Sequence, residues 1–347
     1  MNKAVILTNG LLQKGDAKTA HGLIRGTERY NIIGVIDSES TAGKDAGELL
    51  DGKNRNIPIF ESLHSAQKQL INIDFLIIGI ATIGGVLPHP MLEIVKDAIK
   101  KGISIVNGLH EYLSEKPEIV ELATQNNVTL TDIRKPKTRK DLHFWTGEIY
   151  QVKAKTIAVI GMDCAMGKRT TARMIKQACQ ASGLNAEMIF TGQTGWLQGG
   201  KYGFIFDSTL NDFVSGELEN AIVTCWNETK PDIILLEGQS SLRNPSGPCG
   251  LELLISGNAN YVVLLHAPKR KFFDDDPCWG KIPSVESEIE IIEKLGSKVI
   301  AVALNTEKCS TEEAYEYQNF YEKSLKIPVL LPIQEGVEKI VSTLKAL

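Results

Sequence analysis

The fold of this chain is decided by one stretch, Thr156-Ile-Ala-Val-Ile-Gly-Met-Asp-Cys-Ala-Met-Gly-Lys-Arg-Thr-Thr171. Its first five residues are mostly β-branched or apolar and run into a glycine, which is typical of a buried strand followed by a turn. The pair Gly167-Lys168 follows, and an apolar run with helical spacing continues from Ala172 to Cys179. We therefore expect a strand, a phosphate-binding loop and a helix, in which main-chain N–H groups, the helix N-terminus and the lysine hold phosphate oxygens.

The loop departs from the usual phosphate-loop pattern G-x-x-x-x-G-K-[ST]. The first glycine of that pattern would fall on Met162 and its hydroxyl residue on Arg169, whereas Gly161, Asp163 and Thr170 stand close by. The stretch resembles the G-T-D-x-x-x-G-K variant of dethiobiotin synthetase-type proteins. Because a hydroxyl at the position of Arg169 normally binds Mg²⁺, a phosphate anchor without hydrolysis is one interpretation. An ordinary strand-to-helix turn with a surface lysine is another.

Length and composition restrict the class of protein. The chain has 347 residues, 43% of them hydrophobic and 23% charged, which suits two globular domains. Its net charge of −4 gives no electrostatic reason to expect a nucleic-acid partner. No apolar run reaches about 18 residues, so we expect no membrane span, and the N-terminus enters a strand without a signal-peptide pattern. The six cysteines are scattered without C-x-x-C spacing, which indicates a reducing cytoplasm and no zinc site.

Strands and helices alternate along residues 3–106, which predicts a parallel, helix-covered sheet. We assign residues 1–150 to a Rossmann-like domain and residues 151–347 to a P-loop NTPase-like domain with a doubly wound parallel sheet. The first domain lacks the G-x-G-x-x-G fingerprint, so Asp37, at the end of the second predicted strand, is either a ribose ligand or a solvated strand end. A basic segment around Pro136 suggests the crossing between the domains.

In the second domain, polar side chains recur where predicted strands end. They are Asp163, Lys168, Gln193, Thr194, Asp207, Glu237, Gln239, His266 and Asn305. Because ligands of open α/β sheets bind at the carboxyl ends of the strands, we expect these residues to meet at one edge. Each of them would otherwise be a solvated loop residue.

For several of these residues the sequence is consistent with more than one role. Glu237 follows four apolar residues, where a phosphate-loop protein keeps a carboxylate for Mg²⁺ or for a water, but it could instead only pair with Lys168. His266 is either a general base or a satisfied core histidine. Asn305 is either an adenine-reading residue or a turn asparagine, and Asp207 is either a catalytic carboxylate or a helix cap.

A family resemblance covers nearly the whole chain. It rests on Ala17-Lys-Thr19, Gly108-Leu-His110, Asp132-Ile-Arg-Lys-Pro136, Gly161-x-Asp-Cys-Ala-x-Gly-Lys-Arg-Thr-Thr171, Gly192-Gln-Thr-Gly195, Asp212-Phe-Val-x-Gly216 and Glu237-Gly-Gln239. In these segments the chain resembles a bacterial and archaeal family, long described as a domain of unknown function, with a Rossmann-like N-terminal and a P-loop C-terminal domain. The resemblance implies that fold, and it implies a D-glutamate N-acetyltransferase that uses acetyl-CoA. One departure is Asn244-Pro245, where the pattern would have a histidine–proline pair.

Acetyl transfer to an amine needs loss of a proton, donors for the oxyanion, and positioning. The residues expected to bind the cofactor, with the coenzyme phosphates on Gly167, Lys168, Thr170 and Thr171, are Gly161, Asp163, Gly167, Lys168, Arg169, Thr170, Thr171, Gln193, Gln239 and Asn305. We expect Glu237, Asp207 or His266 to act as the base, and Arg243 or Arg169 to bind the substrate carboxylate. No residue is assigned as a resident metal ligand.

Two other functions stay open. An ATP-dependent ligase or kinase resembling dethiobiotin synthetase would bind ATP and hold Mg²⁺ near Asp163, Thr170 and Glu237. A nucleotide-binding regulatory module would bind its ligand without turnover. In each case we expect a small-molecule ligand, no nucleic acid, no membrane partner, a cytoplasmic location and a homo-oligomer.

Overall fold

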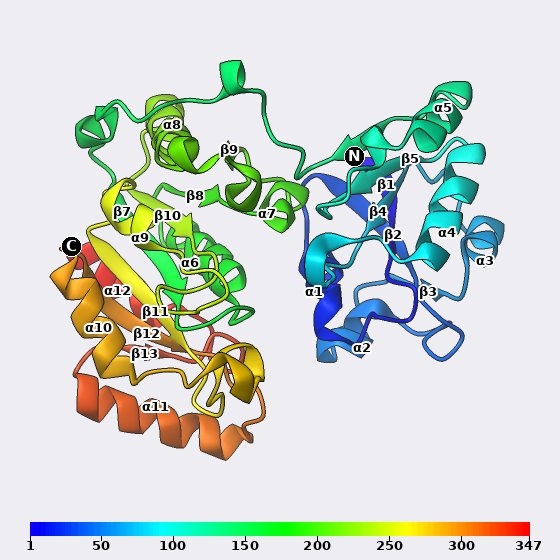
Figure 1. The fold of residues 1–347 in the computed structure, drawn as a ribbon. Helices are drawn as coiled ribbons and strands as arrows, with labels where there is room; N and C mark the ends of the chain where they lie inside the picture. Colours follow the sequence, from blue (N-terminus) through cyan, green and yellow to red (C-terminus); the bar gives the residue numbers. More distant parts are fainter. The chain divides into compact units, whose positions relative to one another are not determined.

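The chain folds into two compact units, described in a computed structural model of residues 1–347 with the side chain of residue 83 excepted. One unit comprises residues 1–136 and 193–199, and the other comprises residues 137–192 and 200–347. Each unit contains one parallel sheet covered by helices (Figure 1), so the predicted α/β class is confirmed. The boundary falls after residue 136, and not after residue 150 as predicted.

The first sheet has six parallel strands in the order β3-β2-β1-β4-β5-β6. Its strands are β1 (Asn2–Leu7), β2 (Tyr30–Ile36), β3 (Ile59–Phe60), β4 (Phe75–Ile78), β5 (Ser104–Asn107) and β6 (Leu130–Asp132). Its helices are α1 (Lys18–Arg25), α2 (Ala46–Asp51), α3 (Leu63–Gln69), α4 (His89–Lys100) and α5 (Pro117–Gln125). The strand order reverses beside β1, as in doubly wound sheets.

Alternate residues of β1 face opposite layers, as the two-residue period of a strand requires. Val5 and Leu7 belong to the apolar cluster packed under α3, α4 and α5. Ala4 and Ile6 belong to the cluster under α1 and α2. All four are fully buried, which explains why this strand reads as an uninterrupted apolar run.

A short helix from later in the chain completes the first unit. This helix, α7 (Gln193–Leu197), packs on α1, and Leu197 is fully buried in the cluster beneath it. The side chain of Gln198 donates a hydrogen bond to the carbonyl of Gly22 in α1 at 2.7 Å. The predicted strand-end loop of the second domain therefore supplies a helix to the first unit.

The second sheet has seven parallel strands in the order β13-β12-β11-β7-β10-β8-β9. Its strands are β7 (Lys155–Gly161), β8 (Ala186–Phe190), β9 (Tyr202–Gly203), β10 (Ile233–Glu237), β11 (Tyr261–His266), β12 (Lys298–Leu304) and β13 (Val329–Leu330). Its helices are α6 (Lys168–Ala181), α8 (Asn211–Thr229), α9 (Leu251–Ile255), α10 (Val285–Lys294), α11 (Thr311–Leu325) and α12 (Lys339–Ala346). No helix among the described residues combines the length and the apolar character that crossing a bilayer requires.

Residues 137–152 lie against α8, which explains the position of the boundary. Glu219 of α8 accepts a hydrogen bond from the N–H of Thr146 at 2.5 Å, and Glu217 accepts one from the N–H of His143 at 2.8 Å. Both glutamates are buried. Because buried carboxylates hold its main chain, this segment is anchored to the second unit, while most of its residues remain exposed.

Candidate functional site

The phosphate loop joins β7 to α6 as the sequence predicts. β7 ends at Gly161, and α6 begins at Lys168, directly after Gly167 (φ +88°). Ala165 also has a left-handed backbone (φ +52°), and this alternation of hand turns successive N–H groups toward one concavity. Among the described residues, the N–H groups of Cys164, Ala165 and Gly167 donate to no protein acceptor. The loop therefore offers the donors and the helix N-terminus that a phosphate needs.

The Lys168 side chain lies buried across this loop. Its ammonium donates to the carbonyl oxygens of Asp163 and Ser240, each at 2.7 Å. A Cβ at Gly161 would lie 3.3 Å from the Lys168 Cδ, and one at Gly238 would lie 3.1 Å from it. Glycine at both strand ends therefore leaves room for the lysine methylenes. The ammonium of Lys168, the residue predicted to bind phosphate, thus donates to neutral carbonyl oxygens of two loops.

Asp163 is fully buried, and its carboxylate is bound by three residues from the loops after β10 and β11. Its Oδ2 accepts from Arg270 Nη1 and from the N–H of Asp274, each at 2.8 Å, and its Oδ1 accepts from Asn244 Nδ2 at 2.9 Å. Arg270 also binds the Glu307 carboxylate through two hydrogen bonds, of 2.7 and 2.9 Å. Asp163 and Arg270 thus tie the loops after β7, β10, β11 and β12 together.

One group of side chains in this network has the spacing of a metal site. Asp163, Cys164 and Asp274 each place a ligand atom within 4.8 Å of the others. Arg270 donates to the Asp163 carboxylate and to the Cys164 carbonyl, at 2.8 and 2.7 Å. Its fixed positive charge opposes a cation there, and Mg²⁺ prefers an octahedron of oxygens. These residues therefore do not fit Mg²⁺.

Glu237 ends β10 and is buried. Its Oε2 accepts a hydrogen bond from the N–H of Thr191 at 3.1 Å. Burial raises the pKa of Glu237, although the charges of Arg169 and Lys168 and the Thr191 N–H act in the opposite direction. A buried carboxylate of raised pKa holds a proton more tightly than an exposed one, which makes Glu237 a candidate proton acceptor.

Gln239 is hydrogen-bonded at the strand ends next to Glu237. Gln239 Nε2 donates to the Thr191 hydroxyl at 2.9 Å, and that hydroxyl donates to the Glu237 carbonyl at 2.8 Å. This chain of bonds fixes the end of β8 against the end of β10. Thr170 is half-buried and Thr171 is buried, both in the first turn of α6.

The other two predicted bases have different surroundings. His266 is buried beside α11, where its Nε2 lies 3.0 Å from Tyr321 Oη and the two rings pack edge-on at 5.3 Å. Burial lowers the pKa of His266 to about 4, so its imidazole is neutral at physiological pH. Asp207 is exposed in a 3₁₀ turn after β9. The core interpretation therefore fits His266 better than the catalytic one.

Two further predicted ligands serve local structure. Arg243 Nε donates to Glu288 Oε2 at 2.6 Å, and its Nη1 donates to Ser287 Oγ at 3.0 Å. Glu288 is buried in α10, so Arg243 would have to leave a buried carboxylate in order to bind a substrate. Asn305 Oδ1 accepts from the N–H of Glu307 at 2.9 Å, as a turn asparagine does.

Gln193 and Asp37 both form hydrogen bonds inside the first unit. Gln193 is buried in α7, and its Nε2 lies 3.4 Å from Thr19 Oγ1 in the same unit. The buried Asp37 carboxylate accepts from the Thr8 hydroxyl (2.7 Å) and from the N–H groups of Gly10 (2.8 Å) and Leu12 (3.1 Å). Asp37 therefore holds the loop after β1. Its carboxylate is already bound by the protein, which argues against the interpretation that Asp37 binds a ribose.

Comparison with known proteins identifies the family. A model described as a domain of unknown function, the DUF1611 P-loop domain, matches residues 143–341. The chain belongs to the DUF1611 family. The DUF1611 Rossmann-like N-terminal domain matches residues 39–136, so the predicted resemblance and the predicted pair of domain types are both confirmed.

The DUF1611 chain has named relatives and a solved structural counterpart. A protein of a Pseudoalteromonas species named D-glutamate N-acetyltransferase is 33% identical over 275 residues, which cover 77% of this chain and 80% of that protein. A Tritonibacter scottomollicae protein of the same name is 28% identical over 278 residues, which cover 78% and 81%. The crystal structure of a DUF1611 family protein from Anabaena variabilis has a TM-score of 0.90 and 26% identity, and it covers 100% of both chains.

Arg270 is a residue of this DUF1611 chain's site that the sequence pattern did not predict. Arg270 lies four residues after the end of β11, so its position beyond a strand end was the available signal. From the sequence, Asn244 is recognisable only as a departure from a histidine. In the structure it is fully buried, and its amide donates to Asp163 and, at 3.0 Å, to Asp274 Oδ2.

Proposed function

We propose that this protein transfers an acetyl group from acetyl-CoA to the amino group of D-glutamate. Two relatives that carry the name D-glutamate N-acetyltransferase each match more than three quarters of the chain. The structural observation that carries the proposal is a cradle of N–H groups in residues 164–167, beside the buried Glu237. Such a cradle suits the pyrophosphate and the 3′-phosphate of coenzyme A as well as it suits ATP.

In this proposal the coenzyme phosphates bind at the start of α6. The N–H of Gly167 and the hydroxyls of Thr170 and Thr171 are the neutral donors. Lys168 exchanges its two carbonyl partners for phosphate oxygens and supplies a point charge. The proposal uses no metal ion.

Glu237 is the proposed base. The D-glutamate ammonium has to lose a proton before its nitrogen attacks the acetyl carbonyl. Because burial raises the pKa of Glu237, this carboxylate is a stronger proton acceptor than an exposed glutamate. The tetrahedral oxyanion that follows needs aimed donors, and collapse of that intermediate expels the coenzyme A thiolate.

Arg169 is the proposed partner of a substrate carboxylate. Its charge acts on Glu237, which is consistent with a position near the base. Arg243, the other predicted candidate, is engaged with Glu288. An arginine binds a carboxylate through two parallel hydrogen bonds, which would orient D-glutamate as well as hold it.

Release of free coenzyme A tests the proposal. We expect rapid release from acetyl-CoA with D-glutamate and slower release with L-glutamate and D-aspartate. Isothermal titration with acetyl-CoA and with ATP–Mg²⁺ separates this function from an ATP-dependent ligase or kinase. Tight ATP binding without acetyl-CoA binding would overturn the proposal, and binding without turnover would indicate a regulatory module.

A matched pair of lysine variants tests the assignment of the phosphate loop. Lys168→Met keeps most of the apolar stem and removes the charge, so we expect the KM for acetyl-CoA to rise at least about tenfold. Lys153→Met changes an exposed lysine just before β7 in the same way. Equal KM values for the two variants would remove Lys168 from the site.

A further inference from the structure

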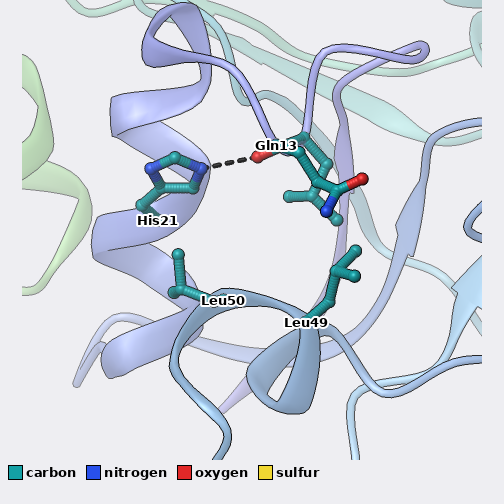
Figure 2. Close-up of a pocket in the computed structure, with 5 residues that line it drawn as sticks. Gln13, His21, Leu49 and Leu50 are labelled. Carbon is teal, nitrogen blue, oxygen red and sulfur yellow. Dashed lines mark hydrogen bonds between the residues drawn. The ribbon is translucent and has the colours of Figure 1, made fainter. Parts of the chain in front are cut away.

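A cavity of about 210 Å³ lies in the first unit. It is lined by Leu12, Gln13, His21, Leu49 and Leu50. Figure 2 shows these side chains around one hollow, contributed by the loop after β1, by α1 and by α2. Pockets for drug-sized ligands measure roughly 300–1,000 Å³, so this cavity suits a single ring system.

Its walls are fixed without any ligand. Asp37 holds the loop through the N–H of Leu12 at 3.1 Å, and Asp45 caps α2 through the N–H of Gly47 at 2.8 Å. His21 Nε2 lies 2.6 Å from the Leu12 carbonyl (Figure 2). A cavity whose walls are already in place costs a ligand little reorganisation.

The lining is apolar and neutral, with one polar group that is open to a ligand. None of its five residues is an acid, a lysine or an arginine. The bond to the Leu12 carbonyl makes His21 Nε2 the donor, and burial lowers the pKa of His21, which favours the neutral ring. Within the described chain, the exposed Gln13 carboxamide forms no hydrogen bond to the protein. It presents a donor and an acceptor side by side.

We infer that this cavity binds a neutral purine base, with adenine as the best match. A glutamine carboxamide pairs with the N6 donor and N7 acceptor of adenine in a bidentate manner. A histidine ring and leucine side chains supply the flat and apolar surfaces that a base packs against. A phosphate or carboxylate ligand finds no cation in this lining.

The site differs from the dinucleotide site of Rossmann folds. That site reads a ribose with an acidic residue at the end of the second strand. Here Asp37 occupies that place and is used by the protein itself. The inference does not depend on acetyl transfer, because the phosphate loop belongs to the other unit.

Isothermal titration of the full chain with adenosine tests the inference, with uridine as the comparison. Gln13→Leu removes the carboxamide, and Gln69→Leu makes the same change at another exposed glutamine of the first unit. We expect the wild type and Gln69→Leu to bind adenosine with the same Kd, and Gln13→Leu to raise that Kd at least tenfold. Uridine, whose single ring fills less of the cavity than a purine does, should bind at least tenfold more weakly than adenosine.

Three results would overturn the inference. The first is no binding of adenosine by the wild type at millimolar concentration. The second is an equal Kd for the two glutamine variants, and the third is equal affinity for uridine. Since Gln13 is an exposed residue of the first unit and the phosphate loop belongs to the second unit, coenzyme A release by Gln13→Leu should match the wild type. The test thus fails or succeeds separately from the proposed acetyl transfer.

Discussion

At the residue scale, Glu237 has a pKa raised by burial, with Arg169 and Lys168 opposing the shift. The folded protein holds this proton more tightly than the unfolded chain. The resulting stabilisation is complete below the ordinary pKa of 4.5 and is lost as the pH rises through the higher folded pKa. We therefore expect Glu237→Gln to unfold at a higher temperature than the wild type at pH 8, and at a similar temperature at pH 4.

The same variant should lose activity, because an amide cannot accept the ammonium proton. We expect coenzyme A release with D-glutamate to fall roughly 10²–10⁴-fold, the usual contribution of a positioned base. Glu61→Gln, at an exposed position of the first unit, is the matched control. Wild-type turnover by Glu237→Gln would remove this residue from the mechanism.

His266 gives the opposite pH dependence. Burial lowers its pKa from 6.5 to about 4, so its contribution to stability is present above pH 6.5 and is lost as the pH falls toward 4. The free energy of unfolding of the wild type should fall between pH 7.5 and pH 4.5, as measured with urea. In His266→Phe we expect this fall to be smaller by up to about 3 kcal/mol. His64→Phe, at an exposed histidine, should leave the wild-type slope unchanged. Equal slopes for both variants would contradict the assignment.

At the scale of the elements, Arg270 connects three loops at the carboxyl edge of the second sheet. It binds Asp163 after β7 and Glu307 after β12, while itself following β11. Arg270→Ala would leave the Asp163 carboxylate buried without its positively charged partner. We therefore expect the free energy of unfolding, measured with urea, to fall by about 3–5 kcal/mol. Lys271→Ala, at the exposed neighbouring position, should cost little. A loss below about 1 kcal/mol would show that Asp163 is satisfied without Arg270.

The close contact between the end of β10 and β7 requires a glycine at position 238, which has no side chain. A Cβ at Gly238 would lie 2.5 Å from the Val159 carbonyl oxygen and 3.1 Å from the Lys168 Cδ. In Gly238→Ala, a strand end or the Lys168 side chain must therefore shift. We expect the free energy of unfolding to fall by about 1–3 kcal/mol and acetyl-CoA to bind more weakly. At Gly247 a Cβ would meet its nearest neighbour at 4.0 Å, so Gly247→Ala is the control. Unchanged acetyl-CoA affinity in Gly238→Ala would separate the strand contact from the site.

At the scale of the whole molecule, the sequence predicted the features that a short local pattern determines, which are the buried strands and the phosphate loop. Buried parallel strands read as apolar runs, and a glycine–lysine pair between a strand and a helix marked the phosphate loop. Arg270 and Asn244 reach Asp163 because β11 and β10 both neighbour β7, and strand order is not written in any one segment. The region of α7, rich in glycine and amides, predicted a loop because its apolar partners lie near residue 22, far away in sequence.

That long-range contact places part of the first unit's core outside the first 136 residues. Without α7, the fragment 1–136 lacks Leu197, which is fully buried in its core, and the Gln198 bonds to the end of α1. Burying one leucine contributes roughly 1.5–3 kcal/mol, a large share of a small domain's stability. We therefore expect the fragment 1–136 to unfold at lower urea, by circular dichroism, than a fusion that joins it through a flexible Gly–Ser linker to residues 191–201. The same fusion with Leu197→Ser should behave like the short fragment. Equal midpoints for the fragment and the unmodified fusion would show that the first sheet and its own helices suffice, and that α7 only rests on them.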